Sequence, residues 1–304
     1  MNHRISTLFN LTIFVIFISC NQDPTAANEK SETSIIAAKD TSSDIPIKKF
    51  QTEVKPRYFL QCLDSGIVSI LKKMDQNQLQ LIYVLNRTDS RYLYRQDSVL
   101  IPDTFLTDIN RYCPFPLKDD SLTSIQKIIF ISYELQLFAA YENGVLLRFG
   151  PVSMGKRSTP TPTGLFHTNW KSKRTVSTID EEWIMNWYFN LDNFEGVSMH
   201  EYDLPGYPAS HACIRMLQED AKWNYYWSQQ WILINDESIG AYGTPVIIYG
   251  EYPFGKRRPW RNLSVNPDTL NISNEELQEI YKCYLPLIHL RQVQRDSLLM
   301  PPVL

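Results

Sequence analysis

Short apolar runs separated by turn residues dominate the middle of the chain. The runs that read as strands are residues 127–132, 135–141, 145–149, 184–191, 197–200 and 244–249. Glu142-Asn143-Gly144 supplies an Asn-Gly turn, which predicts a hairpin between the runs on either side of it. Closely spaced strands with intervening turns predict a mainly β fold, a sandwich or barrel, with flanking helices.

Helical spacing appears further along. Apolar and small residues recur every three or four positions between 216 and 231, which predicts one helix there. Ser273 followed by Glu276 forms a capping box, so another helix is expected from 274 to about 283, ending before Pro286. Its apolar stripe is expected to pack against the central domain.

The amino terminus has the pattern of a secretory signal. Arg4 precedes an apolar run from Leu8 to Ile18, which is too short for a confident membrane span and stops at Ser19-Cys20. A small residue followed by Cys resembles a bacterial lipoprotein signal, in which Cys20 becomes lipidated after residues 1–19 are removed. The alternative is an ordinary signal peptide cleaved nearby. Either reading predicts an extracytoplasmic protein of the cell envelope.

Residues 20–56 read as a flexible tether because they are rich in Ser, Thr, Ala and charged residues and lack sustained periodicity. Asn21 is not the Asp of the inner-membrane retention signal, which favours the outer membrane and a periplasmic location.

Residues 57–120 are predicted to form a small α/β unit. It contains an apolar run at 79–87, turn residues Asn86 and Asp89, and a strand-like end at 98–102. The run from Leu85 to Pro102 resembles the second half of a LysM module, with Gln96-Asp97 where that pattern has Gly. This resemblance implies glycan binding; the alternative is a structural cap or spacer.

Composition and charge exclude several classes. Apolar residues make up 43% and charged residues 21% of the chain, values typical of soluble globular proteins. The formal net charge of −3 gives none of the basic surplus of a nucleic-acid binder, so no nucleic-acid partner is expected. The chain also lacks GxGxxG and Walker-type GK[ST] sequences.

Of the five cysteines, Cys62 and Cys113 bracket the small unit and are candidates for a disulfide in an oxidising compartment. If Cys20 is lipidated, three remain besides Cys213, so at least one thiol is unpaired, and the sequence does not say which. No Cys/His spacing of a zinc site occurs, and no metal is expected.

Residues 200–216 concentrate the groups needed for nucleophilic catalysis: a thiol, two imidazoles, a hydroxyl and a guanidinium. A cysteine attacks as its thiolate, so a nearby imidazole must take the thiol proton, and His200 and His211 are the candidates closest to Cys213. Backbone N–H groups at Ala212 and Cys213 are placed to stabilise an oxyanion. The alternative is that Cys213 is a small buried residue and the histidines are bystanders.

Three pieces in order resemble the YkuD-type L,D-transpeptidase catalytic domain. They are the hairpin with its turn at Asn143-Gly144, Met154-Gly155 with Thr161-Pro-Thr-Gly164, and His200 followed by Ser210-His211-Ala212-Cys213-Ile214-Arg215-Met216. The resemblance implies a YkuD-like β-sandwich catalytic domain at 125–250, between the small unit and a C-terminal helical extension at 251–304.

The resemblance also implies roles for the site. Cys213 would be the acylated nucleophile, His200 the proton donor and acceptor, and His211 a group that polarises the substrate carbonyl. Ser210 would orient an imidazole. Arg215 would bind a carboxylate or brace the site; the alternative is a structural ion pair.

Two features depart from the family pattern. Ala212 stands where the family usually has Gly, which costs about 1 kcal/mol if that position needs a positive φ. The nine-residue spacer between His200 and Ser210 is short for the family and must turn sharply through Pro205-Gly206-Tyr207-Pro208.

The implied reaction is acyl transfer on peptidoglycan stem peptides, as donor and acceptor, with 3-to-3 cross-links formed through a cysteinyl thioester and no cofactor. The alternatives are an L,D-carboxypeptidase or exchange enzyme, in which water or another amine resolves the thioester, and an inactive wall-binding lipoprotein.

In the extension, Lys256–Arg261 is expected to be a solvated loop or a contact for anionic wall or lipid groups, and His289 a structural or exposed residue without a metal.

Overall fold

The computed structural model describes residues 55–176, 184–235 and 238–300, all within one compact unit, Glu53–Leu304. The predicted signal segment, Cys20 and almost all of the tether lie outside the described residues, so those expectations stay predictions. Among the described residues, no helix is both long enough and apolar enough to cross a membrane.

The N-terminal part is a strand–helix–helix–strand unit. It consists of β1 (Tyr58–Cys62), α1 (Ser65–Leu71), α2 (Gln76–Asn86), a single 3₁₀ turn η1 (Leu93–Arg95) and β2 (Ser98–Pro102). The two strands pair antiparallel, and a capping box of Asp75 and Gln78 starts α2. The expected small α/β unit is therefore present, while glycan binding by it stays a prediction.

The central domain is built on one nine-stranded sheet. Its strands, in spatial order, are β6 (Gly164–His167), β13 (Pro245–Tyr249), β3 (Lys127–Ser132), β4 (Leu137–Glu142), β5 (Val145–Ser153), β10 (Ile214–Met216), β9 (Val197–Glu201), β8 (Ile184–Asp192) and β7 (Lys171–Val176). β13 runs parallel to β3, and β10 runs parallel to β9; the other neighbours are antiparallel. The predicted hairpin joins β4 to β5, with positive φ at Asn143 and Gly144.

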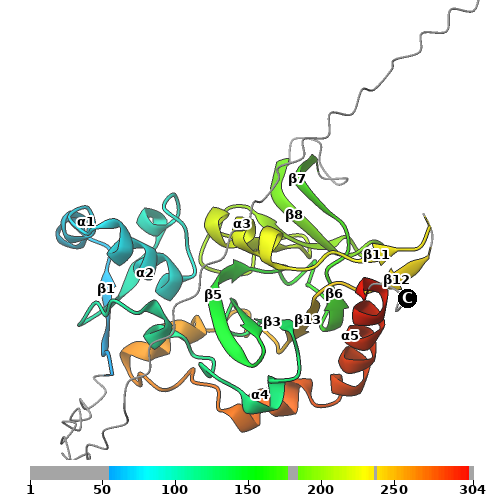
Figure 1. Cartoon of the computed structure of the whole chain (residues 1–304). Coiled ribbons are helices and arrows are strands. Elements are labelled where there is room, and N and C mark those ends of the chain that lie inside the picture. The colour runs from blue at the N-terminus through cyan, green and yellow to red at the C-terminus, as the bar shows by residue number, and fades with distance from the viewer. Residues whose placement is uncertain (1–54, 177–183, 236–237, 301–304) are drawn as a thin grey trace, which may run out of the picture. The chain divides into compact units, whose positions relative to one another are not determined.

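The sheet curls so that its two halves face each other (Figure 1). Ile129 of β3, Val246 of β13, Met199 of β9 and Met216 of β10 belong to one buried apolar cluster, together with Ala221 of α3 (Gln218–Trp227). This arrangement confirms the mainly β fold with flanking helices, and the helix predicted between 216 and 231 is α3.

The outer face of β3 and β4 is covered by the N-terminal unit and the C-terminal extension. Leu85 of α2, Phe130 of β3 and Leu277 of α4 (Asn274–Tyr281) lie in a second buried cluster, which we call the shared core. The capping box of Ser273 and Glu276 starts α4, as predicted. The remaining short elements are η2 (Ile109–Tyr112), η3 (Asp120–Leu122), β11 (Ile232–Leu233), β12 (Ile239–Ala241) and η4 (Pro259–Ser264).

The final helix, α5 (Leu285–Leu299), was missed by the sequence analysis, which took Pro286 as a stop. Proline is tolerated in the first turn of a helix, where its missing N–H has no partner to lose, and Pro286 occupies that turn.

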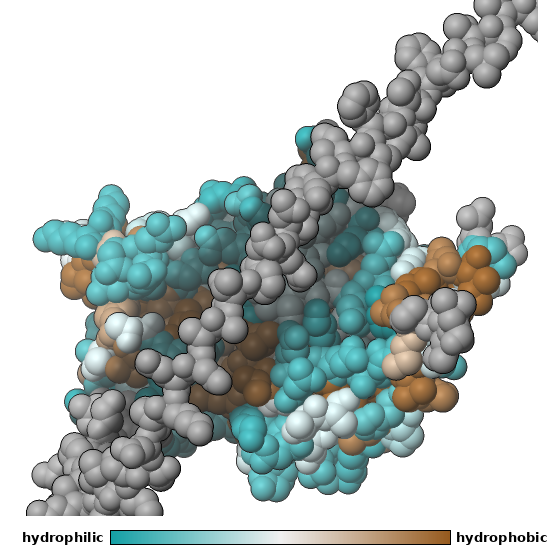
Figure 2. Space-filling view, in the orientation of Figure 1, coloured by the Kyte–Doolittle hydropathy of each residue, from teal (hydrophilic) through white to brown (hydrophobic). Residues whose placement is uncertain are grey.

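The end of α5 and the nearby β11–β12 pair expose apolar side chains (Figure 2): Leu233, Ile234, Ile239, Leu298, Leu299 and Met300.

Two further expectations are wrong. Cys62, Cys113 and Cys283 are free cysteines, so no disulfide staples the small unit. Cys62 is exposed, whereas Cys113 lines a cavity, where burial raises its pKa to about 12. The expectation for Lys256–Arg261 is wrong only for the second half of that segment: Lys256 and Arg257 are exposed, but Trp260 is fully buried and Arg261 pairs with Asp97 of the N-terminal unit.

Candidate active site

The parallel pairing of β9 and β10 brings the predicted nucleophile and base together. Arg215 lies opposite His200 in the register, and Cys213, which directly precedes β10, lies beside Ser198. Because side chains alternate along a strand, Ser198 and His200 share one face while Met199 points into the core. The sheet therefore places Cys213 and His200 as diagonal neighbours on one face.

Cys213 is half-buried and carries two sulfur contacts. The Ser198 hydroxyl donates to Sγ at 3.2 Å, and the thiol donates to the Gly196 carbonyl at 3.3 Å. Burial raises the pKa of the Cys213 thiol, while the bonds from Ser198 and the charge of Arg215 oppose that rise. The resting side chain is therefore a neutral thiol. When it loses its proton, the Ser198 hydroxyl is placed to donate a hydrogen bond to the thiolate.

His200 is buried and held in one tautomer. Its Nδ1 lies 2.9 Å from the Glu201 carbonyl oxygen, which can only accept, so the ring proton is on Nδ1 and Nε2 carries a lone pair. Tyr188 stacks on the ring at 6.3 Å between centroids. Burial lowers the pKa of His200 to about 4, so the imidazole is neutral at physiological pH.

The two groups are thus suited to general-base chemistry rather than to a resting ion pair. Neutral Nε2 is free to accept a proton, and the Cys213 thiol holds one. Within the described residues no hydrogen bond links Sγ and Nε2, since the thiol proton points to Gly196. Catalytic hydrogen bonds of this kind commonly tighten only when substrate is bound.

His211 is held by a cation that the sequence analysis did not single out. The Lys156 ammonium donates to His211 Nε2 at 2.9 Å. Partial burial and the charges of Lys156 and Arg215 lower the pKa of His211. The ring is therefore neutral and occupied at Nε2, which suits a polar wall of the site better than a proton carrier.

The loop after β5 supports the residues before Cys213. Ser210 donates its backbone N–H to Met154 O at 3.0 Å, and Thr161 Oγ1 donates to Ala212 O at 2.8 Å while accepting from Gly155 N at 2.8 Å. A Cβ on Gly155 would lie 2.2 Å from Thr159 O, so this position requires glycine. The second and third family-like pieces of the sequence are therefore packed against each other.

Ser210 does not play its expected part. Its hydroxyl donates to the Cys213 carbonyl oxygen and not to an imidazole. Ser210 and Cys213 are three positions apart, and serine side chains commonly bond to backbone groups at such short separations. Ser210 thus fixes the backbone that carries the nucleophile.

Ala212 adopts the left-handed conformation, with φ of 77°. Neither the Ala212 nor the Cys213 N–H donates a hydrogen bond within the described part of the chain, so both remain available to an oxyanion. Because φ is positive, alanine at this position is less favourable than the glycine that the family usually has there.

The Arg215 guanidinium lies over the Tyr202 ring, 4.6 Å from its centroid, and forms no ion pair or hydrogen bond with the described residues. Burial lowers its pKa, although a guanidinium remains charged. This contact with Tyr202 fits the expected bracing role, and carboxylate binding by Arg215 stays a prediction.

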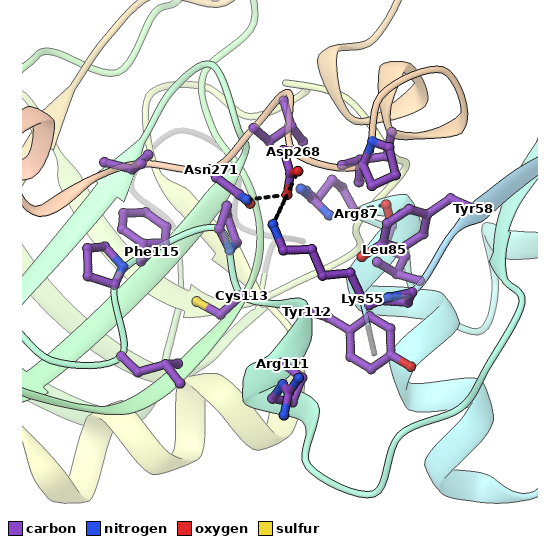
Figure 3. A pocket seen from close by; sticks show the side chains of 18 residues that line it. Lys55, Tyr58, Leu85, Arg87, Arg111, Tyr112, Cys113, Phe115, Asp268 and Asn271 are labelled. Carbon is purple, nitrogen blue, oxygen red and sulfur yellow. Dashed lines mark hydrogen bonds and ion pairs between the residues drawn. The ribbon is translucent and has the colours of Figure 1, made fainter. Parts of the chain in front are cut away.

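A separate cavity of about 320 Å³ lies between the N-terminal unit and the extension (Figure 3). Tyr58, Arg87, Cys113 and Asp268 line it, and none of the predicted site residues does. Arg87 caps α2 by donating to Val84 O, and it crosses to the central domain by donating to Leu135 O. Cys113 is a buried thiol of high pKa, so the cavity has no activated nucleophile.

No group of three or more His, Cys, Asp or Glu side chains in the described residues is arranged to hold a metal ion. His289 lies near Ser124 and belongs to no such group.

One family model matches the central part of the chain. Residues 126–248 match the family model YkuD, the L,D-transpeptidase catalytic domain. The central domain is thus a YkuD-type domain, which confirms the resemblance seen in the sequence.

Similar solved structures include three L,D-transpeptidases. That of Stackebrandtia nassauensis is 20% identical, with a TM-score of 0.34, over 42% of this chain and 57% of that chain. That of Mycobacterium smegmatis is 23% identical, with a TM-score of 0.33, over 41% and 59%. L,D-transpeptidase 1 of Mycobacterium tuberculosis is 25% identical, with a TM-score of 0.31, over 41% and 62%. The match spans less than two thirds of each of these chains, and no curated protein matches this one.

Sequence reasoning missed Ser198, Tyr188 and Lys156. Ser198 had a local signal, because it stands two residues before His200 and so shares its strand face. Tyr188 and Lys156 had no local sequence signal. Tyr188 reaches the site because β8 pairs with β9, and Lys156 reaches it from the loop after β5.

Proposed function

We propose that this protein is a peptidoglycan L,D-transpeptidase that forms 3-to-3 cross-links through a thioester on Cys213. The observation that carries the proposal is the placement of Cys213 beside His200, whose Nδ1–H is fixed on the Glu201 carbonyl so that Nε2 can accept the thiol proton. The YkuD-type domain supports the same class of chemistry.

In the first half-reaction, Sγ attacks the carbonyl carbon of the third stem residue while His200 Nε2 takes the thiol proton. The carbonyl oxygen becomes an oxyanion, which the free N–H groups of Ala212 and Cys213 stabilise. When this intermediate collapses, the peptide bond breaks and the imidazolium gives its proton to the departing D-alanine amine. The product is a thioester on Cys213.

In the second half-reaction, the amine of a neighbouring stem peptide attacks the thioester carbonyl. His200 takes a proton from the attacking amine, and the C–S bond breaks as the new amide forms. The proton then returns to sulfur, which restores the resting thiol. Arg215, unpaired within the described residues, would hold a stem-peptide carboxylate during both steps.

Mass spectrometry of the chain from residue 21 onward, incubated with disaccharide tetrapeptide, tests this proposal. We expect an acyl adduct on Cys213 and 3-to-3 dimers. Cys213→Ala should lose both, whereas Cys283→Ala, which removes an exposed free cysteine elsewhere, should keep both. Tripeptide without dimers would favour the L,D-carboxypeptidase. Absence of any adduct from folded, reduced protein would favour the inactive wall-binding lipoprotein.

We further propose that Cys20 is lipidated and that the protein works in the periplasm, anchored to the outer membrane. The lipoprotein-like signal and the Asn at position 21 support this location. Metabolic labelling with a fatty acid should mark the wild type and not Cys20→Ser, and the variant should leave the membrane fraction.

A further inference from the structure

The loop between His200 and Ser210 is contacted by the N-terminal unit. Thr88 and Pro205 form an isolated antiparallel bridge. Asp89 N donates to Leu204 O at 3.2 Å, and the Thr88 hydroxyl donates to the same oxygen at 3.0 Å. Leu204 is fully buried in this contact. The turn at Thr88–Tyr92, more than a hundred residues earlier in the chain, is therefore docked on the loop of the active site.

The Asp89 carboxylate joins the two segments. One oxygen, Oδ1, accepts from the backbone N–H groups of Arg91 at 2.8 Å and Tyr92 at 2.9 Å, which fixes the turn. The other, Oδ2, accepts from Leu204 N at 2.8 Å. Only a carboxylate can bond both segments in this way, because each of its two oxygens accepts a hydrogen bond and neither donates one.

More contacts surround this bond. Gln96 Nε2 donates to Pro205 O at 3.0 Å, and Arg258 of the extension donates to Gln96 Oε1. Arg91 pairs with Asp203, although both side chains are partly exposed, so this pair adds little. The first half of the loop is thus bonded to the N-terminal unit.

The second half of the loop is held differently. Ser153 of β5 accepts from Ala209 N at 3.2 Å and donates to Tyr207 O at 2.8 Å. The central domain therefore fixes the end that leads to Ser210. It also holds the first loop residue after β9, because Tyr202 N donates to Met216 O at 3.2 Å, and the N-terminal unit fixes the next segment, around Leu204. Glu201, whose carbonyl sets the His200 tautomer, stands three residues before Leu204.

The same loop contacts Arg215, because the guanidinium lies over the Tyr202 ring, 4.6 Å from its centroid. The loop that the N-terminal unit holds at Leu204 therefore borders the group proposed to bind the substrate carboxylate.

We propose that Asp89 of the N-terminal unit is a positioning residue for catalysis, which holds the loop after His200 through Leu204. This inference rests on the proposed function of Cys213 and His200. It predicts that the N-terminal unit is required for turnover and is not only a spacer.

Asp89→Asn tests the role selectively. The amide oxygen of the variant can keep the turn bonds to Arg91 and Tyr92, whereas its NH₂ group faces the Leu204 N–H as a second donor. Asp103→Asn is the matched control, because Asp103 likewise joins a backbone N–H and a side chain of Arg57, at the edge of the unit.

The full chain is assayed in three ways. With disaccharide tetrapeptide we expect Asp89→Asn to lower kcat about tenfold with KM changed less than twofold, since misplaced catalytic groups affect turnover more than binding. At pH 7 we expect site-resolved iodoacetamide alkylation of Cys213 to slow by a similar factor, and deuterium exchange at Leu204 to accelerate. Asp103→Asn should match the wild type in all three.

The outcomes separate the two proposals. If no chain turns over the tetrapeptide but Cys213 alkylation still slows only in Asp89→Asn, the positioning role stands and the proposed function fails. If Asp89→Asn keeps wild-type turnover and Cys213 reactivity, the positioning role is wrong, whatever happens to exchange at Leu204.

Discussion

Ala212 occupies a left-handed backbone position immediately before Cys213, with φ of 77°. The Cβ of an L-residue there costs about 1 kcal/mol relative to glycine. We therefore expect Ala212→Gly to raise the free energy of unfolding by about that amount, and Tm by about 3 °C for a domain of this size. Chemical and thermal denaturation measure both.

A matched control lies in the same loop. Ala209 is not among the residues with positive φ, so Ala209→Gly should give no stabilisation and should cost a few tenths of a kcal/mol or more through the greater freedom of the unfolded chain. If Ala212→Gly destabilises as much as Ala209→Gly, backbone strain at position 212 is not the explanation.

The low pKa of His200 sets the acidic limit that we expect for the proposed activity. A base must be neutral to accept a proton, and burial lowers the His200 pKa from an ordinary value near 6.5 to about 4. As pH falls, His200 should therefore stay neutral through pH 6.5 and become protonated only near pH 4. We expect the acidic limb of kcat/KM for Cys213 acylation to have its midpoint near pH 4. A midpoint near 6.5 in folded protein would show that the imidazole is not desolvated as described.

At the scale of elements, helix α4 packs on the shared core through Leu277 and Tyr281, and the Tyr281 hydroxyl also donates to Asp119. Leu277 is fully buried in the shared core, whereas Leu290 of α5 is 55% exposed. Removing a buried leucine side chain leaves a cavity, so Leu277→Ala should lower the free energy of unfolding by about 2–5 kcal/mol, and Leu290→Ala by less than about 1 kcal/mol. Urea denaturation of the two variants checks this, and equal losses would contradict the packing of α4.

Local sequence signals predicted the elements whose causes are local. The Asn143-Gly144 turn, the Ser273–Glu276 capping box and the Cys213 motif each depend on a few adjacent residues. Helix α5 was missed because Pro286 was interpreted as the end of a helix, whereas it lies in the first turn of a new one. The buried Trp260 was missed because the pattern of charges around it suggested exposure.

At the scale of the whole molecule, the relation of the three parts was beyond sequence reasoning. Asp89 contacts Leu204, and Arg261 pairs with Asp97, across 115 and 164 positions respectively. Such contacts depend on how the sheet curls and on which face each part covers, and no local periodicity encodes either. The sequence therefore predicted the catalytic motif but not what holds its loop.

The shared core also has a consequence for unfolding. Leu85 of the N-terminal unit, Phe130 of the sheet and Leu277 of the extension lie in one buried cluster, so each of the three parts buries some of its apolar surface against the others. We expect the described unit to unfold in one cooperative calorimetric transition, because loss of any part exposes the apolar surface of the others. Leu85→Ala and Leu277→Ala, in different parts, should each lower the midpoint of that same transition without splitting it. Two resolved transitions, with each variant shifting only one of them, would instead mean that the N-terminal unit and the extension fold independently of each other.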